Sequence, residues 1–230
     1  MTLSRSDRRW ARRKEARPAE LTAAALELFV ERGYSATRLD DVAARAGVSK
    51  GTLYLYFSSK EELFKAVVRE GLLPVIERGE RLSEEHTGSA GDLIRRLIRN
   101  WWESVGRTPL AGIAKLMISE SGNFPEIAQF YYQEVLTRGH RLMDAAVRRG
   151  MESGEFRRLD PDFAVRLLVA PLVMLSIWRF SFDFCDSRRL DPQQYLDHHI
   201  DIFLNGLRAE GGKPARAGNV VSINRKGKNK

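Results

Sequence analysis

Residues 38–57, RLDDVAARAGVSKGTLYLYF, decide the fold of this chain because they read as two short helices joined by a tight turn. In the first helix, Leu39, Val42 and Ala46 recur at three- and four-residue spacing, which gives one apolar face. Thr37 stands directly ahead of this helix, where a hydroxyl side chain can cap it. Gly47 follows at the position where a helix end needs a residue tolerant of left-handed dihedrals. The pattern predicts a helix-turn-helix.

The second helix of this unit begins after Ser49, a predicted N-cap, and turns Leu53 and Phe57 inward. Its remaining side chains point outward and are small, hydroxylated or basic, which suits an element that enters a DNA groove. The residues predicted to contact DNA, here and in the flanking segments, are Thr37, Arg38, Ser49, Lys50, Gly51, Thr52, Tyr54, Tyr56 and Lys60.

Each of these residue types has a use at a DNA surface. Gly51 lets the backbone approach the base edges, and Thr52 offers a hydroxyl for a base or phosphate and a methyl group for a thymine. The hydroxyls of Tyr54 and Tyr56 can reach phosphate oxygens, which fix register without reading sequence. Lys60 would neutralise a phosphate near the start of the next helix. The alternative is that the tyrosines only pack and the lysines are only solvated.

Residues 22–65, TAAALELFVERGYSATRLDDVAARAGVSKGTLYLYFSSKEELFK, resemble the DNA-binding domain of TetR-family transcriptional regulators. The matching parts are the AA-x-x-LF segment with Gly33-Tyr34, the AGVS turn, the GTLY and YF segments, and the SSKEEL start of the following helix. Val42 stands where the family usually has isoleucine, a conservative difference. The resemblance implies an all-α, two-domain homodimer, with a helical domain for ligand binding and dimerisation after the DNA-binding domain.

The composition favours an intracellular protein that binds nucleic acid. The chain has 230 residues, one cysteine and a net charge of +8. Residues 1–17 carry a charge of +5 and residues 208–230 one of +6, so the middle is slightly acidic. A basic segment beside a DNA-binding unit adds salt-dependent affinity for phosphates. No signal peptide and no run of about 18 apolar residues is present, so we expect a cytoplasmic location and no membrane partner.

No strand signal follows the helix-turn-helix, and the apolar spacing predicts nine helices in all. Pro18 is expected to open the first helix, and Ser59 with Glu62 forms a capping box for the fourth. Pro74 is expected to kink or split that helix. The predicted organisation is a basic arm (1–17), a DNA-binding domain (18–64), a helical ligand-binding and dimerisation domain (65–208) and a basic, disordered tail (209–230).

The eighth predicted helix is apolar nearly all round between Arg166 and Arg179, so it must be covered on every side. A second copy of the chain is the expected cover, because two helices from each of two subunits form a four-helix interface. The resemblance implies the same role for the last two helices. The residues predicted for this interface are Leu168, Leu172, Leu175, Tyr195, His199, Ile200, Phe203 and Leu204. Such a dimer places two recognition helices about 34–36 Å apart on a near-palindromic site.

The larger domain is rich in bulky side chains that are either ordinary core or the lining of an apolar pocket. The resemblance favours a pocket for an unknown small-molecule effector, and the segment IAKLMISESGNFPEIAQFYY resembles an efflux and stress-control subgroup of the family. Relief of repression by such a ligand is the predicted switch. The residues predicted to line the pocket are Trp101, Trp102, Met117, Phe124, Phe130, Tyr131, Met143, Trp178 and Phe182.

Other functions have less support in the sequence. His198 and His199 are adjacent on a helix and point in different directions, so we expect no metal site, and nothing implies a cofactor. No phosphate loop, nucleophile elbow or HExxH motif is present, so we expect no enzymatic activity. Two alternatives remain: a constitutive or architectural DNA-binding protein without a ligand switch, and a small-molecule-binding helical protein or enzyme that does not bind DNA.

Overall fold

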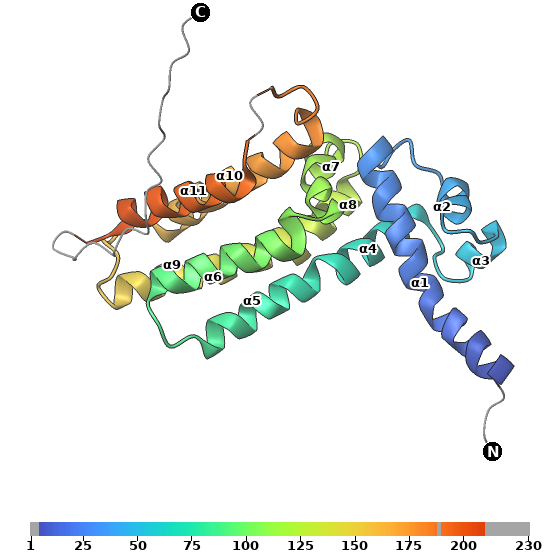
Figure 1. Ribbon diagram of the computed structural model, residues 1–230, viewed down its shortest axis with the longest axis horizontal. Coiled ribbons are helices and arrows are strands. Elements are labelled where there is room, and N and C mark those ends of the chain that lie inside the picture. The colour runs from blue at the N-terminus through green and yellow to red at the C-terminus, as the bar shows by residue number, and fades with distance from the viewer. Residues whose placement is uncertain (1–4, 188–189, 210–230) are drawn as a thin grey trace, which may run out of the picture.

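The computed structural model describes residues 5–187 and 190–209, and all regular elements among them are helices. The prediction of an all-α fold is confirmed. The expectation of a disordered tail concerns residues that lie, from 210 onward, outside this described part, as do the first four residues of the basic arm. Figure 1 shows the N-terminal helices on one side and the remaining helices as a larger bundle on the other.

The N-terminal unit contains α1 (Arg5–Arg32), α2 (Leu39–Arg45) and α3 (Lys50–Tyr54). The predicted start of α1 at Pro18 is wrong, because the helix begins at Arg5 and Pro18 lies inside it. The preceding residues are mostly arginine, alanine, glutamate and lysine, which are strong helix formers and extend the helix past the proline. The core face of α1 is fully buried, with Leu21, Ala25 and Leu28 each at most 1% exposed.

A helical connection with one break leads from this unit into the bundle. α4 (Lys60–Gly71) and α5 (Leu73–Glu85) meet at Leu72, and Pro74 lies in the first turn of α5. Proline cannot donate the backbone hydrogen bond that a continuous helix needs, so the predicted split is confirmed. The side chain of Ser59 caps α4 by accepting from the Glu62 amide at 3.1 Å.

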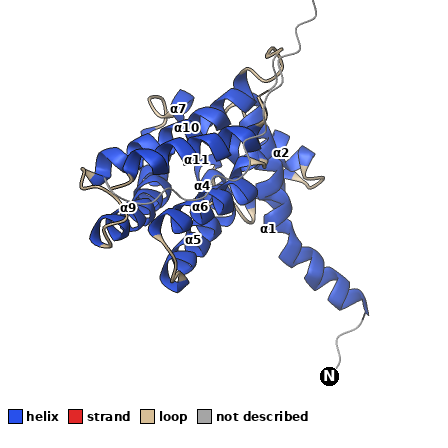
Figure 2. Cartoon of the chain, turned by 60° about the vertical axis from the view of Figure 1, so that its left-hand side comes forward, coloured by secondary structure: helices blue, strands red, loops and turns tan. Residues whose placement is uncertain are grey.

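The bundle is built from five further rods. α6 (Ala90–Trp101) runs into a π-helical turn, η1 (Trp102–Gly106), and the short η2 (Pro109–Ala111) runs into α7 (Gly112–Glu120). α8 (Pro125–Tyr131), η3 (Tyr132–Leu136) and α9 (Thr137–Glu152) form one rod, followed by α10 (Pro161–Ser181) and α11 (Pro192–Leu207). Figure 2 shows the bundle from another side, with helices throughout. With α4 and α5 counted as one broken helix, the described residues form the nine predicted rods.

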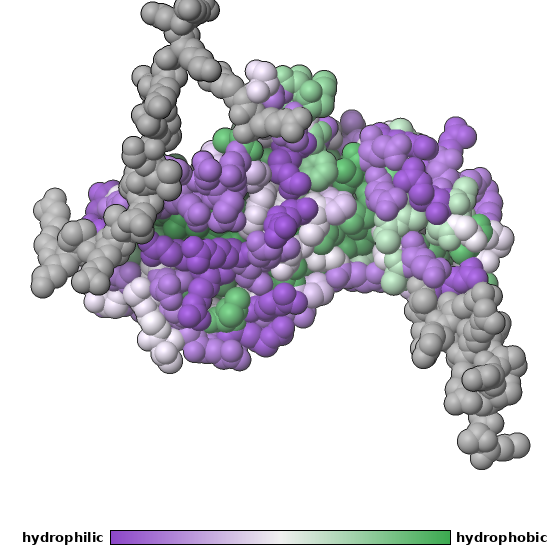
Figure 3. Space-filling view, viewed as in Figure 1, coloured by the Kyte–Doolittle hydropathy of each residue, from purple (hydrophilic) through white to green (hydrophobic). Residues whose placement is uncertain are grey.

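Two hydrophobic cores hold these helices, and their border does not coincide with the border between the units. The first core joins α1–α4 to η2, α7 and α8, through residues such as Phe29, Phe64, Ile113 and Ile127. The second joins α6, α9, α10 and α11. Trp101 packs against both. Hydrophobic surface is visible between the N-terminal unit and the bundle in Figure 3.

α10 is long and apolar enough to span a membrane by length and composition alone, although only 33% of its most apolar window is buried in the subunit. In the fold it packs along α7, α9 and α11 and contributes Leu168, Leu172 and Leu175 to the second core. Its opposite side exposes a row of apolar residues at helical spacing, namely Phe163, Leu167, Met174, Trp178 and Phe182. α10 is therefore a core helix with one uncovered apolar side.

Candidate DNA-binding interface

The turn between α2 and α3 is closed by backbone hydrogen bonds and by one glycine. Gly47 has a φ of +66°, a left-handed conformation that a side chain would strain. The Val48 amide donates to the Ala43 carbonyl at 2.9 Å, and the Ser49 side chain accepts from the Thr52 amide at 3.1 Å. α3 therefore starts directly after α2 and is held against it, with its inward residue Leu53 fully buried.

Five of the residues predicted to bind DNA lie at or near the side of α3 away from the core and are exposed or half-buried: Ser49, Lys50, Gly51, Thr52 and Tyr54. Tyr56 lies beyond α3 and packs half-buried against the first core, as the packing alternative predicts. The ammonium of Lys50 lies 2.9 Å from the Asp40 carboxylate and 5.9 Å from the centre of the Tyr54 ring. Its hydrogen bond to Asp40 raises the pKa of Lys50. Lys50 is therefore an exposed cation that is paired with Asp40 beside the outward side of α3. Arg38, the N-cap of α2, is also exposed.

Thr37 does not occupy the position predicted for it. Its side chain is 1% exposed, and its hydroxyl oxygen lies 2.7 Å from the Gly33 carbonyl and 3.2 Å from the Leu28 carbonyl. It neither caps α2, whose N-cap is Arg38, nor faces solvent. The reason is that the hydroxyl bonds to carbonyls at the end of α1, including that of Gly33 just beyond the last helical residue. The predicted DNA contact of Thr37 is therefore wrong, and its role is to position the α1–α2 turn.

Lys60 also turns inward, toward the α1–α2 turn. Its ammonium donates to the carbonyls of Tyr34, Ser35 and Thr37 at 2.7, 3.1 and 3.1 Å. It also lies 4.5 Å from the centre of the Tyr34 ring. Partial burial lowers the pKa of Lys60, while burial and nearby carboxylates raise the pKa of Tyr34 to about 12. The predicted phosphate contact conflicts with these bonds, because the ammonium already has three acceptors.

The same turn is held from the bundle side by the end of α7. Glu120 is 9% exposed and accepts from the Ser35 amide at 3.1 Å. Phe124 packs edge-on against Tyr34, with ring centres 4.7 Å apart. Gly33, with a φ of +89°, leaves room for Glu120, whose oxygen would lie 3.1 Å from an added Cβ atom. The α1–α2 turn is thus held by contacts from both domains. The sequence did not indicate the contacts from the bundle.

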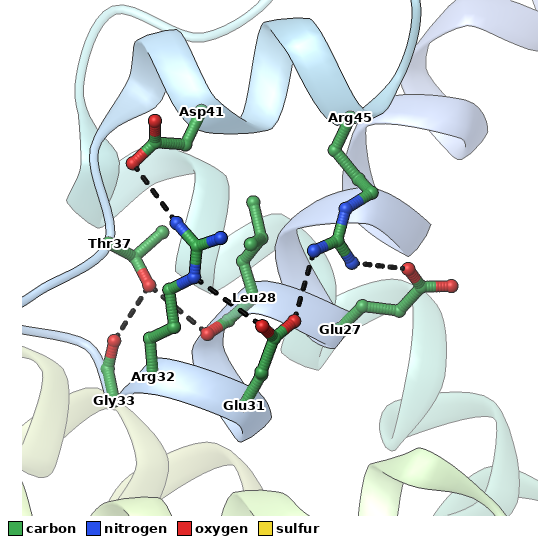
Figure 4. A network of polar contacts seen from close by, with 8 residues as sticks. All are labelled: Glu27, Leu28, Glu31, Arg32, Gly33, Thr37, Asp41 and Arg45. Carbon is green, nitrogen blue, oxygen red and sulfur yellow. Dashed lines mark hydrogen bonds and ion pairs between the residues drawn. The ribbon is translucent and has the colours of Figure 1, made fainter.

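An ion network fixes α2 across α1, as Figure 4 shows. Arg45 on α2 lies 3.0 Å from Glu27 and 3.0 Å from Glu31 on α1, and Arg32 lies 3.5 Å from Asp41. The hydrogen bond from Arg45 lowers the pKa of Glu31. Because these groups are exposed, each pair contributes little to stability, and the network mainly sets the orientation of α2.

Leu55 was not among the predicted contact residues, yet its side chain is 83% exposed at the end of α3. The sequence did carry a signal for it. Leu55 follows the inward Leu53 by two positions, and two residues of helix turn a side chain by about 200° to the opposite side.

Family profiles match both parts of the chain. The profile described as "Bacterial regulatory proteins, tetR family" matches residues 21–67, and "Tetracyclin repressor-like, C-terminal domain" matches residues 84–181. Together they span more than half of the 230 residues. This chain belongs to the TetR family. TetR-family proteins are transcriptional regulators, so the chain is a DNA-binding transcriptional regulator and not an enzyme.

Individual TetR-family relatives align over most of the chain. The transcriptional repressor KstR2 of Mycobacterium tuberculosis is 29% identical over 85% of this chain and 94% of its own length. The fatty acid metabolism regulator protein of Bacillus subtilis is 28% identical over 67% of this chain and 80% of its own. The crystal structure of FadR from Bacillus subtilis with stearoyl-CoA has a TM-score of 0.68 at 23% identity, and the match covers 83% of this chain and 99% of that one. This last likeness shows the shared TetR-family fold.

The predicted dimer interface needs correction. Five of its eight residues are buried inside one subunit, between α10, α11 and their neighbours, and cannot face a second one: Leu168, Leu172, Leu175, Ile200 and Leu204. Tyr195, His199 and Phe203 are half-buried, and the Nε2 atom of His199 lies 2.8 Å from the Leu168 carbonyl. An apolar helix does not indicate which of its sides its own subunit covers. Here the uncovered sides are the α10 row and Ile202 on α11, which is 71% exposed.

The nine predicted pocket residues do not line one cavity. Trp101, Met117, Phe124, Phe130 and Tyr131 pack into or against the first core, and Met143 packs against the second. Two adjacent clefts of about 760 and 430 Å³ lie instead at the C-terminal end of α10 and share Arg179 and Pro192. Trp178 lines the larger cleft and Trp102 the smaller, whereas Phe182 continues the exposed row of α10.

Proposed function

We propose that this regulator is a repressor that binds a near-palindromic operator as a homodimer and is released by a small apolar or amphipathic ligand. The observation that carries the DNA-binding part is the outward side of α3, where basic, hydroxylated and small residues surround a backbone held by the turn below it. Repression is proposed because KstR2, aligned over 94% of its length, is named a repressor. The activator FasR of Mycolicibacterium smegmatis aligns over only 26% of its length.

The dimer is proposed to form through the uncovered sides of α10 and α11. Phe163, Leu167, Met174 and Trp178 are separated by four, seven and four residues, which is one or two helical turns, so they lie on one side of α10, with exposed fractions between 37% and 68%. A contiguous apolar surface of this kind on a soluble protein marks an interaction site. Two copies of α10 and α11 would form a four-helix interface that leaves both α3 helices free for DNA.

The ligand class is proposed from the relatives. The Bacillus subtilis relative is named for fatty acid metabolism, and the two clefts beside α10 have volumes in the range of small-molecule sites. Arg179 lines both clefts and lies 5.6 Å from the centre of the Trp102 ring, so cationic and aromatic groups are combined there. The carboxylates of Asp183, Asp186 and Asp191 also line the clefts, so the acyl-CoA class rests on the stearoyl-CoA in the FadR structure, with Arg179 as the cation that would pair with its anionic head. The efflux and stress-control subgroup suggests the competing ligand class, apolar antibiotics.

The proposal is tested with the purified full chain. Selection from random duplex DNA at two salt concentrations should yield a two-fold symmetric sequence whose preference persists at the higher salt. Stearoyl-CoA should then release the protein from that sequence, and a panel of apolar antibiotics tests the competing class. Binding without sequence preference and with steep salt dependence would favour the architectural alternative. No retention on DNA even at low salt would favour a protein that does not regulate transcription.

A further inference from the structure

Leu55 is the most exposed large apolar side chain among the described residues of the N-terminal unit, at 83%. Leu53, two residues earlier, is fully buried, and Phe57, two residues later, is 8% exposed. The chain therefore places one leucine in water between two residues that hold α3 to its core. The other exposed side chains around it are polar or charged, apart from the Tyr54 ring.

The backbone fixes the direction of Leu55. Its amide donates to the Gly51 carbonyl at 3.2 Å, and its φ of −69° and ψ of −24° continue the helix. On a helix Leu55 lies about 200° from Leu53, so it points directly away from the core. Gly51 is one turn earlier on the same side, and a Cβ atom there would meet nothing closer than 3.9 Å. The centre of the outward side of α3 is thus a bare stretch of backbone beside a leucine.

The chemistry of the major groove limits what such a side chain can recognise. Base edges in this groove present hydrogen-bond donors and acceptors and one apolar group, the C5-methyl of thymine. Leucine has no hydrogen-bonding atom, so its only favourable contact with a base edge is with that methyl group. The neighbours Lys50, Thr52 and Tyr54 carry polar atoms for the phosphates and the other base atoms.

We propose that Leu55 reads a thymine methyl group in each half of the operator. The inference rests on the proposed function, because it requires α3 to enter the major groove. It adds the chemical identity of one base-reading contact, and it makes Leu55 a specificity-determining residue. The rim of polar groups around Leu55 favours a DNA surface over an apolar partner protein, which would need a broader apolar patch.

The test combines one substitution in the protein with one in the DNA. On the selected operator, each thymine is replaced in turn by deoxyuridine, which removes only the methyl group. With the unaltered protein, at least one thymine in each half-site should matter, with a loss of affinity of about four-fold for one methyl and about fifteen-fold for the symmetric pair, from the transfer free energy of one methyl-sized group. A thymine contacted by the Thr52 methyl group would also matter, but its effect would persist in Leu55→Ala. With Leu55→Ala, the methyl dependence of at least one thymine in each half-site should disappear.

The control variant is Ile118→Ala, because Ile118 is also an exposed apolar residue, at 64%, but lies on α7. It should keep the full methyl dependence. Unchanged thermal unfolding of Leu55→Ala would show that the variant is folded. Equal methyl dependence in the unaltered protein and in Leu55→Ala would overturn the inference and leave the proposed function intact. If the chain selected no sequence, the proposed function would fail and the inference with it.

Discussion

Replacing Lys60 by methionine tests whether this residue holds the α1–α2 turn, as in the structure, or contacts a DNA phosphate, as the sequence predicted. A hydrogen bond from a charged group contributes about 1.5–3 kcal/mol to stability. Three carbonyls share the Lys60 ammonium, which is only partly buried, so the three bonds are not counted as three independent contributions. We therefore expect Lys60→Met to lower the free energy of unfolding by about 2 kcal/mol, the value of one such bond.

The matched control is Lys65→Met, five residues along the same helix. Lys65 pairs with Glu61 at 2.6 Å and Glu62 at 3.3 Å, and these surface pairs contribute at most about 1 kcal/mol. Urea unfolding of the full chains at one fixed protein concentration measures both variants, because the stability of a dimer depends on concentration.

The salt dependence of DNA binding by Lys60→Met can refute the positioning role of Lys60. If Lys60 only holds the α1–α2 turn, Lys60→Met leaves the salt dependence of operator affinity unchanged. If each subunit instead places Lys60 on a phosphate, the slope of log affinity against log salt falls by about 2 for the dimer. That fall, together with an unchanged free energy of unfolding, would refute the positioning role argued from the structure.

Three further outcomes are expected. Glu120→Ala removes the acceptor of the Ser35 amide and should lower the free energy of unfolding by about 1 kcal/mol in urea. Met174→Arg places a charge on the exposed side of α10 and should give monomers in light scattering, whereas Leu172→Ala creates a cavity and should cost about 2–5 kcal/mol without dissociating the dimer. Burial raises the pKa of Tyr34 and of Tyr131 to about 12, so the unfolded chain loses these protons first and stability should fall as pH rises from 10 to 12. Tyr34→Phe should reduce that fall, measured by urea unfolding across this range.

The helix-turn-helix could be predicted because its determinants are local. Apolar spacing, a glycine and a serine cap lie within a few residues of one another, and Gly47 and Ser49 take the conformations that their chemistry favours. The helical rods of the bundle could be predicted for the same reason, since Asp160 and Asp191 cap α10 and α11 directly before a proline, as the sequence indicated.

The residues that the sequence misplaced depend on contacts between distant segments. Lys60 reaches carbonyls more than twenty positions earlier in the chain, and Glu120 reaches Ser35 across the border of the two domains. The spacing of apolar residues along the sequence does not indicate contacts between such distant positions. The same holds for α10, where Leu168 and Met174 are both apolar, yet Leu168 is buried by its own subunit and Met174 is 54% exposed.

The first hydrophobic core has a consequence for how this regulator can be dissected. Because Ile113 and Ile127 from the bundle belong to the same core as Phe29 and Phe64, a fragment ending after α4 would expose part of that core to water. A fusion of this DNA-binding domain to the ligand-binding domain of another regulator is therefore expected to need η2, α7 and α8 as well. The practical unit for protein engineering is larger than the segment that meets DNA.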